Sequence, residues 1–279
     1  MKEFTFTLFA IVNGIGAASG LLYEQDKLKI VSDDSEVLYV YDLKEEVLAK
    51  ISLREDGKLI ELQEKALKPD YESITRLENE ILIFGSGSSP NRNILAKIKD
   101  AKPNSVEITP LDEFYDKLRK VTGVGEEDFN IEGAIAKRDL LLLFNRGNGP
   151  NAKNGIFRIK NWQASENIEI EFIPIQLPVI ADVPFGFTDA IQVGEEVYFL
   201  ASAETGGSTY HDGEVLGSII GILDGKTFEL KTTKQITNKH KLEGIVLYEK
   251  TEDSFVFLLC EDPDDGGSNA KLFKLELKI

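Results

Sequence analysis

The sequence contains little cysteine and little histidine, and this scarcity excludes several kinds of site. Cys260 is the only cysteine among 279 residues, so the chain has no internal disulfide and no cysteine-based zinc site. The two histidines, His211 and His240, leave little material for a histidine-rich metal centre or a catalytic triad. We expect Cys260, which ends an apolar run, to be a small buried residue. We expect His211 to be a solvated loop residue, with a place in a binding pocket as the alternative.

Long apolar runs and an excess of positive charge are also missing. No run approaches eighteen apolar residues, so we expect no membrane span. Thirty-two Lys and Arg against 48 Asp and Glu give a net charge of −16, whereas binding to nucleic acid or an anionic membrane needs a basic surface. We therefore exclude both as the main partner and expect a monomer that folds as a globular protein.

Two interpretations are open for the first residues. Residues 4–12 begin with alternating Phe and Thr, which predicts a strand with one apolar face. The same stretch, followed by Ala17-Ala18-Ser19, also has the order of a weak signal peptide with its cleavage site. We favour the strand because the repeat described next needs these residues. Accordingly we expect a cytoplasmic protein, with export as the alternative.

A pattern of two strands recurs along the chain at a nearly constant spacing. Each unit opens with a small or acidic residue, followed by an apolar strand, a polar turn and a second apolar strand; the opening residues are Ser19, Glu72, Glu132, Asp189 and Glu243. Successive openings are 53, 60, 57 and 54 residues apart (72−19, 132−72, 189−132 and 243−189). This period suits a four-stranded propeller blade. We predict an all-β protein, a five-bladed β-propeller spanning residues 1–279 as one domain, with six blades as the alternative count.

The ends of the chain predict how the ring closes. The last unit offers strands at residues 244–248, 254–260 and 271–277 and then stops one strand short, whereas residues 3–12 form a strand without a blade. Pairing the two would remove two sheet edges. The exception to the β pattern is a short helix at residues 109–121, between blades two and three, with Thr109 as N-cap and Pro110 in its first turn. Its apolar stripe is Leu111, Phe114, Tyr115 and Leu118.

Polar loops follow the second strand of every unit. In four units the opening residue lies 13 positions before the end of the second strand, so in an antiparallel hairpin both lie at one end of the sheet. The loops begin at Ser32-Asp33-Asp34, Gly85-Ser86, Asn145-Arg146, Ala203-Glu204 and Glu261-Asp262. The connectors between blades bring Lys68, Asp70, Asn130, His240 and Lys241 to the same end. We expect the functional site at this mouth of the ring.

Four of the five opening residues are acidic and would line the axis. Two carboxylates about 6 Å apart repel by about 3 kcal/mol at an effective dielectric of about 20, so such a ring must take up protons, a cation or water. A hard cation with oxygen ligands resolves the repulsion, and Ca²⁺ suits a roomy site better than Mg²⁺, which stays possible. The expected ligands are Ser19, Glu72, Glu132, Asp189 and Glu243. The alternative is that acidic residues merely begin strands as solvated groups.

The order of these motifs resembles the calcium-activated nucleotidases, the apyrase type with a five-bladed propeller. The segments that carry the likeness are Ser19-Gly20-Leu21, Asp33-Asp34, Lys68-Pro69-Asp70-Tyr71-Glu72, Ile131-Glu132-Gly133-Ala134, Phe144-Asn145-Arg146, Gly186-Phe187-Thr188-Asp189 and Lys241-Leu242-Glu243-Gly244. The chain is also similar to bacterial propeller proteins of unassigned function. The resemblance implies calcium on the five opening residues, a water-activating role for Asp33 or Asp34, and phosphate neutralisation by Arg146.

These residues predict a calcium-dependent hydrolase that acts on a phosphate anhydride or ester. Asp33, Asp34 and Arg146 are the expected catalytic residues. Around them we expect the small anionic substrate to meet Lys68, Arg92, Asn145, Glu204 and Asp262. Two alternatives stay open: a lactonase- or glycosidase-type propeller enzyme, and a non-catalytic propeller that binds a sugar, peptide or protein and holds a structural metal.

Overall fold

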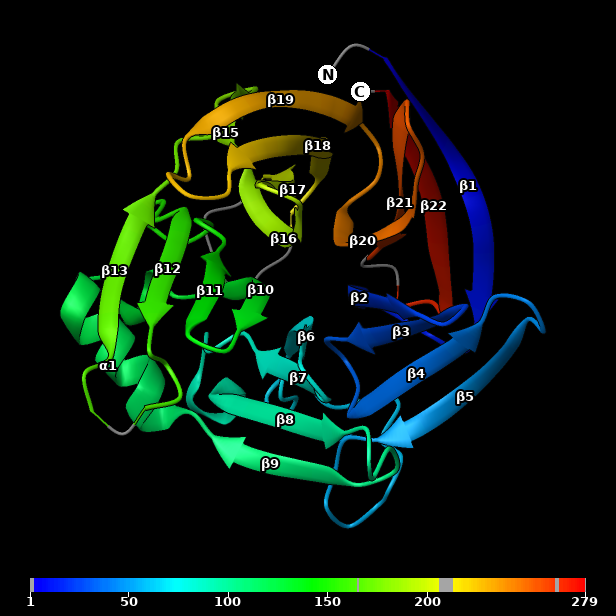
Figure 1. Ribbon diagram of the computed structural model, residues 1–279, viewed down its shortest axis with the longest axis horizontal. Helices are drawn as coiled ribbons and strands as arrows, with labels where there is room; N and C mark the ends of the chain where they lie inside the picture. Colours follow the sequence, from blue (N-terminus) through cyan, green and yellow to red (C-terminus); the bar gives the residue numbers. More distant parts are fainter. Residues whose placement is uncertain (1–2, 165, 206–212, 264–265, 279) are drawn as a thin grey trace.

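Five antiparallel sheets of four strands surround a central axis in the manner of propeller blades (Figure 1). This computed structural model describes residues 3–164, 166–205, 213–263 and 266–278. Blade one contains β2 (Ala18–Glu24), β3 (Lys27–Ser32), β4 (Val37–Asp42) and β5 (Val47–Ser52). Blade two contains β6 (Tyr71–Leu77), β7 (Glu80–Gly85), β8 (Ile94–Lys99) and β9 (Val106–Pro110). Blade three contains β10 (Ile131–Lys137), β11 (Leu140–Asn145), β12 (Gly155–Lys160) and β13 (Glu169–Pro174).

The remaining blades complete the ring. Blade four contains β16 (Gly186–Val193), β17 (Glu196–Glu204), β18 (Val215–Asp224) and β19 (Leu230–Thr237). Blade five contains β20 (Leu242–Lys250), β21 (Ser254–Glu261), β22 (Asn269–Lys278) and β1 (Phe4–Asn13). A short hairpin of β14 (Val179–Ile180) and β15 (Val183–Pro184) joins blades three and four. The predicted five-bladed propeller is confirmed, and the alternative count of six is wrong.

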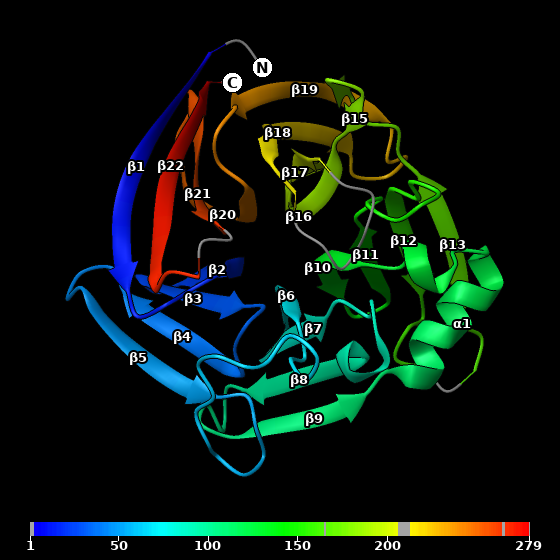
Figure 2. The same cartoon turned by 180° about the vertical axis from the view of Figure 1, so that it is seen from behind.

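The two ends of the chain close the ring, as predicted. Strand β1 pairs antiparallel with β22, from Phe4 opposite Leu277 to Asn13 opposite Asn269. Both ribbon views show β1 as the outermost strand of blade five, beside β22 (Figures 1 and 2). The ring of Phe6 stacks on that of Phe273, with centroids 4.8 Å apart. Blade five is therefore built from the first and the last segments of the sequence.

The hydrophobic core lies between neighbouring blades. The second strand of blades two to five is nearly continuously apolar, as in Leu-Leu-Leu-Leu-Phe of β11, because both faces of its sheet are covered. Between blades three and four, Phe187 makes edge-to-face contacts with Phe144 and Phe199, at centroid distances of 5.4 and 5.0 Å. The outermost strands β9 and β13 alternate polar and apolar residues over most of their length, because one of their faces meets solvent.

Helix α1 (Asp112–Thr122) lies outside blade three, beside β13 (Figure 1). Its apolar stripe is confirmed, with Tyr115 and Leu118 fully buried. The predicted N-cap is wrong: Thr109 and Pro110 still pair with β8, and the N-cap position is Leu111. The ladder of blade two thus extends further than the cap motif suggested. No helix in the described ranges is long and apolar enough to cross a membrane.

Candidate functional site

The innermost strand of every blade carries a bulge, and in blades two, three and five the bulged residue is a glutamate that lines the channel cavity. In blade two, Tyr71 pairs with Gly85 and Ser73 with Phe84, which leaves Glu72 without a partner in the ladder. The residues in this position are Ser19, Glu72, Glu132, Thr188 and Glu243. A bulge of this kind re-aims a side chain at the start of a strand. Four of the five predicted axial residues therefore occupy the expected position, and Thr188 takes the place expected for Asp189.

The residue after each bulge faces the next blade, and in four of the five blades this residue is a glycine or a serine: Gly20, Ser73, Gly133 and Gly244. A Cβ at Gly244 would lie 2.6 Å from Cys260 Sγ and 2.9 Å from Leu21 Cγ, so a larger residue does not fit there. Asp189 occupies the same position in blade four. Its carboxylate accepts hydrogen bonds from the amides of Ala190 (2.7 Å) and Ile245 (2.8 Å). The predicted register of blade four is thus wrong by one residue, and Asp189 binds blade five instead of facing the axis.

The mouth of the channel opens into a cavity of about 480 Å³ that is lined mainly by charged side chains. The acidic residues around its floor are Asp33, Asp34, Asp70, Glu72, Glu132, Glu204, Glu243 and Asp262, and the basic ones are Lys68, Arg92, Arg146 and Lys241. Eight acidic and four basic residues give this set a formal charge of −4. These residues lie at the end of each sheet where the first strand begins and the second strand ends, which is the end at which the sequence predicts the site.

Three carboxylates meet on the axis. One oxygen each from Glu72, Glu132 and Glu243 lies within 4.8 Å of the others. All three are at least nine-tenths buried, with exposed fractions of 8%, 3% and 3%. Burial is the main reason that the pKa of each carboxyl group lies above its ordinary value. Neighbouring carboxylates raise the pKa of Glu72 further, starting with Glu132.

Glu72 differs from the other two in its surroundings. Among the described residues, no lysine or arginine nitrogen lies within 4 Å of its carboxylate, and no donor bonds to it. Glu132 and Glu243, in contrast, have cationic neighbours. A buried carboxylate is rarely left without a partner, because the loss of hydration is then uncompensated. The three axial carboxylates are therefore a group that could hold a metal ion.

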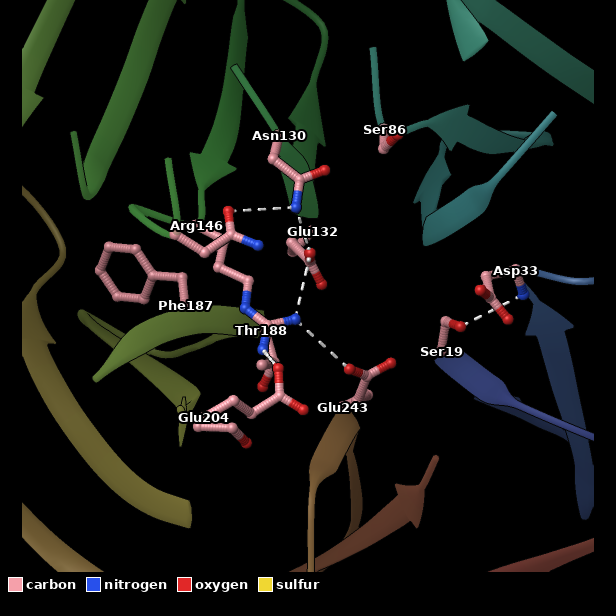
Figure 3. A network of polar contacts seen from close by, with 12 residues as sticks. Ser19, Asp33, Ser86, Asn130, Glu132, Arg146, Phe187, Thr188, Glu204 and Glu243 are labelled. Carbon is pink, nitrogen blue, oxygen red and sulfur yellow. Dashed lines mark hydrogen bonds and ion pairs between the residues drawn. The ribbon is translucent and has the colours of Figure 1, made fainter. Parts of the chain in front are cut away.

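Arg146 lies between carboxylates of three blades (Figure 3). Its Nη1 is 3.4 Å from Glu132 and 3.6 Å from Glu243, and its Nη2 binds Glu204. Lys241 contacts the same side of the cavity, with Nζ at 3.2 Å from Glu243 and 3.3 Å from Asp262. Both cations are buried. They offset part of the acidic charge of blades three to five.

Lys68 organises the opposite side of the cavity. Its Nζ binds Asp33 and lies 3.1 Å from Asp34 and 3.2 Å from Asp70. Arg92 reaches Asp70 from the other direction, at 2.6 Å. Burial raises the pKa of Asp33 to about 8, although the nearby ammonium of Lys68 acts against this shift. Asp34 is the more exposed member of the pair, with 37% of its side chain accessible.

Several predicted site residues therefore come together, and others do not. Asn145 does not line the cavity: its amide donates to the carbonyls of Asp128 and Lys153, and its oxygen accepts from the Asn130 amide. Its predicted contact with substrate is corrected to a structural role. The hydroxyl of Ser19 accepts a hydrogen bond from the Asp33 amide at 3.2 Å, so it supports the aspartate loop (Figure 3). His211 falls outside the described residues.

Other residues of the cavity received no role from the sequence. Asp70 and Lys241 were expected at the mouth only as parts of connectors, yet they bind Lys68 and Glu243 respectively. The connector between β5 and β6 adds Glu61 and Lys65 to the rim. Its unusual length was the available signal, since long loops on a rigid scaffold often carry function.

Comparison with known proteins assigns a family and supports the fold. The model of a family of unknown function, DUF6929, matches residues 14–277, so the chain belongs to that family. A luciferin-regenerating enzyme is similar over 98% of this chain and 95% of its own, with a TM-score of 0.52 and 11% identity. The major allergen Mala s 1 of Malassezia sympodialis is similar over 96% of both chains, with a TM-score of 0.56 and 8% identity. At such identities the likeness shows the fold alone, and the nucleotidase resemblance stays a prediction. The sequence matches none of the curated proteins.

Proposed function

We propose that this propeller binds one divalent cation, Ca²⁺ in the first instance, on Glu72, Glu132 and Glu243, and that it hydrolyses a phosphate anhydride or ester at the mouth of the channel. The observation that carries the proposal is the axial cluster, in which three buried carboxylates converge and Glu72 has no cationic partner among the described residues. Its donors are all carboxylate oxygens, the ligands that hard cations prefer. The family of unknown function to which the chain belongs supplies no activity of its own.

The bound cation would neutralise phosphate oxygens and help to position water. Of the two candidate bases, Asp34 suits the role better, because 37% of its side chain is accessible. Asp33 binds Lys68 through Oδ2, and its Oδ1 is buried without a hydrogen-bond partner. Asp33 therefore positions Lys68, and Asp34 accepts the proton of the attacking water.

The charge of the cavity makes substrate binding depend on the cation. Without a metal ion the lining residues carry a formal charge of −4, which repels a phosphate group. The four basic residues are already engaged by carboxylates. Arg146 is the best placed of them to meet a phosphate oxygen, since it borders the axial cluster. An anionic substrate should thus bind only to the calcium-loaded protein.

The test combines calcium binding with phosphate release. Isothermal titration with CaCl₂ and MgCl₂ should show one site in the wild type and loss of binding in Glu72→Gln and Glu243→Gln. Glu61→Gln is the matched control, because Glu61 lines the same cavity at its exposed rim. Phosphate release from nucleoside triphosphates and p-nitrophenyl phosphate should require CaCl₂, stop with EDTA and fall at least tenfold in Asp34→Asn. Absence of calcium binding would overturn the proposal.

A second candidate is hydrolysis of a neutral ester, lactone or glycoside. The observation that favours it is the same formal charge of −4, which a neutral substrate tolerates. Calcium binding without phosphate release, together with cleavage of a lactone or aryl glycoside, would select this alternative. Calcium binding with no activity on either panel would leave a non-catalytic propeller with a structural cation.

A further inference from the structure

A second group of carboxylates adjoins the axial cluster. One oxygen each from Asp33, Asp70 and Glu72 lies within 4.8 Å of the others, so Glu72 belongs to both groups. This second group already contains a positive charge, because the ammonium of Lys68 binds Asp33 and lies 3.2 Å from Asp70. Asp34 lies 3.1 Å from the same nitrogen. An ammonium has three donors, and here three carboxylates surround it.

We propose that Lys68 serves as a built-in cation that keeps a second Ca²⁺ site closed, and that removing its charge lets Asp33, Asp70 and Glu72 bind a second Ca²⁺ beside the first. The inference rests on the proposed function only in counting the axial ion as the first. The sequence analysis expects Lys68 to bind the substrate, whereas here its ammonium group takes the place of a metal ion.

Two observations besides the acidic residues support a ligand at this place. Glu72 is buried, with 8% of the residue exposed, and among the described residues no ion pair within 4 Å joins its carboxylate to a cation. Oδ1 of Asp33 is also buried without a hydrogen-bond partner. The group therefore keeps unused acceptor atoms even with the lysine in place.

The shared carboxylate is the geometric argument for two adjacent ions. In two-metal centres the ions lie about 3.5–4 Å apart, a distance that one carboxylate can bridge. Glu72 belongs to both groups, with Glu132 and Glu243 in one and with Asp33 and Asp70 in the other. Loss of the Lys68 charge would change the formal charge of the residues that line the cavity from −4 to −5, which increases the attraction for a second divalent ion.

Calcium stoichiometry tests the proposal directly. Isothermal titration of the full chain with CaCl₂ should give one ion per chain in the wild type and two in Lys68→Met, which is one atom shorter, unbranched and uncharged. Lys65→Met is the matched control, because Lys65 lines the same cavity from an exposed position, and it should bind one ion. The double variant Lys68→Met/Asp70→Asn should also return to one ion, since it loses a ligand of the second site.

The folding of Lys68→Met supplies a second readout. In EDTA we expect its melting temperature to lie below that of the wild type, and CaCl₂ should restore it. One ion per chain in both proteins would overturn the proposal, as would a variant that stays unfolded in 10 mM CaCl₂. A failure of the proposed function gives a different result. No ion in the wild type but one in Lys68→Met would contradict the axial site and support the second site. No ion in either protein would overturn both.

Discussion

Substitution of Glu72 by glutamine should stabilise the metal-free protein and abolish its stabilisation by calcium. The carboxylate of Glu72 lies within 4.8 Å of those of Glu132 and Glu243, and each such pair repels by at least about 3.5 kcal/mol at an effective dielectric of about 20. Glutamine has nearly the same shape and no charge. The substitution therefore removes two repulsive pairs, about 7 kcal/mol before any proton is bound.

Proton uptake reduces the gain that can be measured. Burial raises the pKa of Glu72, so part of the repulsion is relieved at neutral pH by protonation. We expect the free energy of unfolding to rise by about 1–3 kcal/mol at pH 8, which is the part of the repulsion that protonation does not already relieve. For a chain of this size the melting temperature should rise by about 2 °C per kcal/mol.

Calcium should stabilise the wild type and leave the stability of Glu72→Gln unchanged. At a concentration 100 times its dissociation constant, a ligand adds about 2.7 kcal/mol to the stability of the protein that binds it. The wild type should gain this amount in CaCl₂, and Glu72→Gln should gain nothing. Thermal melts in EDTA and in CaCl₂ measure both quantities, with Glu61→Gln as control. A variant that melts below the wild type in EDTA, yet responds normally to CaCl₂, would refute the reasoning.

Three further predictions concern pH and packing. The pKa of Asp33 is about 8 in the folded protein against 3.8 for an ordinary aspartate, so the folded state binds more protons between these pH values. The metal-free protein should therefore lose stability as the pH rises from 6 to 8. A melting temperature that does not change over this range would contradict the prediction. Gly244→Ala should lower the free energy of unfolding in urea by about 1–3 kcal/mol, because the added Cβ would lie 2.6 Å from Cys260 Sγ. Gly125→Ala is the control, since no atom lies nearer than 4.0 Å to a Cβ added there. Phe6→Ala should lower the free energy of unfolding by about 1–3 kcal/mol, since the Phe6 ring stacks on Phe273 in the sheet that closes the ring. An effect no larger than that of Thr5→Ala would show that this closure contributes little to stability.

The architecture could be predicted because each blade repeats one pattern of apolar strands. The spacing of Ser19, Glu72, Glu132 and Glu243 identifies equivalent bulges in four blades. In blade four the pattern misled, because Asp189 resembles the acidic residue of the other repeats while Thr188 occupies the bulge. Residue type alone does not show which of two neighbours leaves the ladder.

The pairing within the cavity could not be predicted. Chain order places Lys68 and Arg146 at the mouth, but their partners depend on distances across the channel. Arg146 binds Glu204 from blade four and approaches Glu243 from blade five, 97 residues away (243−146). Those distances follow from the packing of whole sheets. The start of α1 was missed for a similar reason, since Thr109 and Pro110 are held by their neighbours in β8 rather than by local capping.

The closing sheet also has a consequence for biosynthesis. Strand β1 precedes its partner β22 by about 260 residues in the sequence, so it leaves the ribosome long before the strand that pairs with it. Until then Phe4 and Phe6 have no sheet to cover them. Pairing across such a separation is slow, because the chain must lose loop entropy before it gains the contact. The apolar side chains of β1 therefore stay exposed on the nascent chain until β22 has been made.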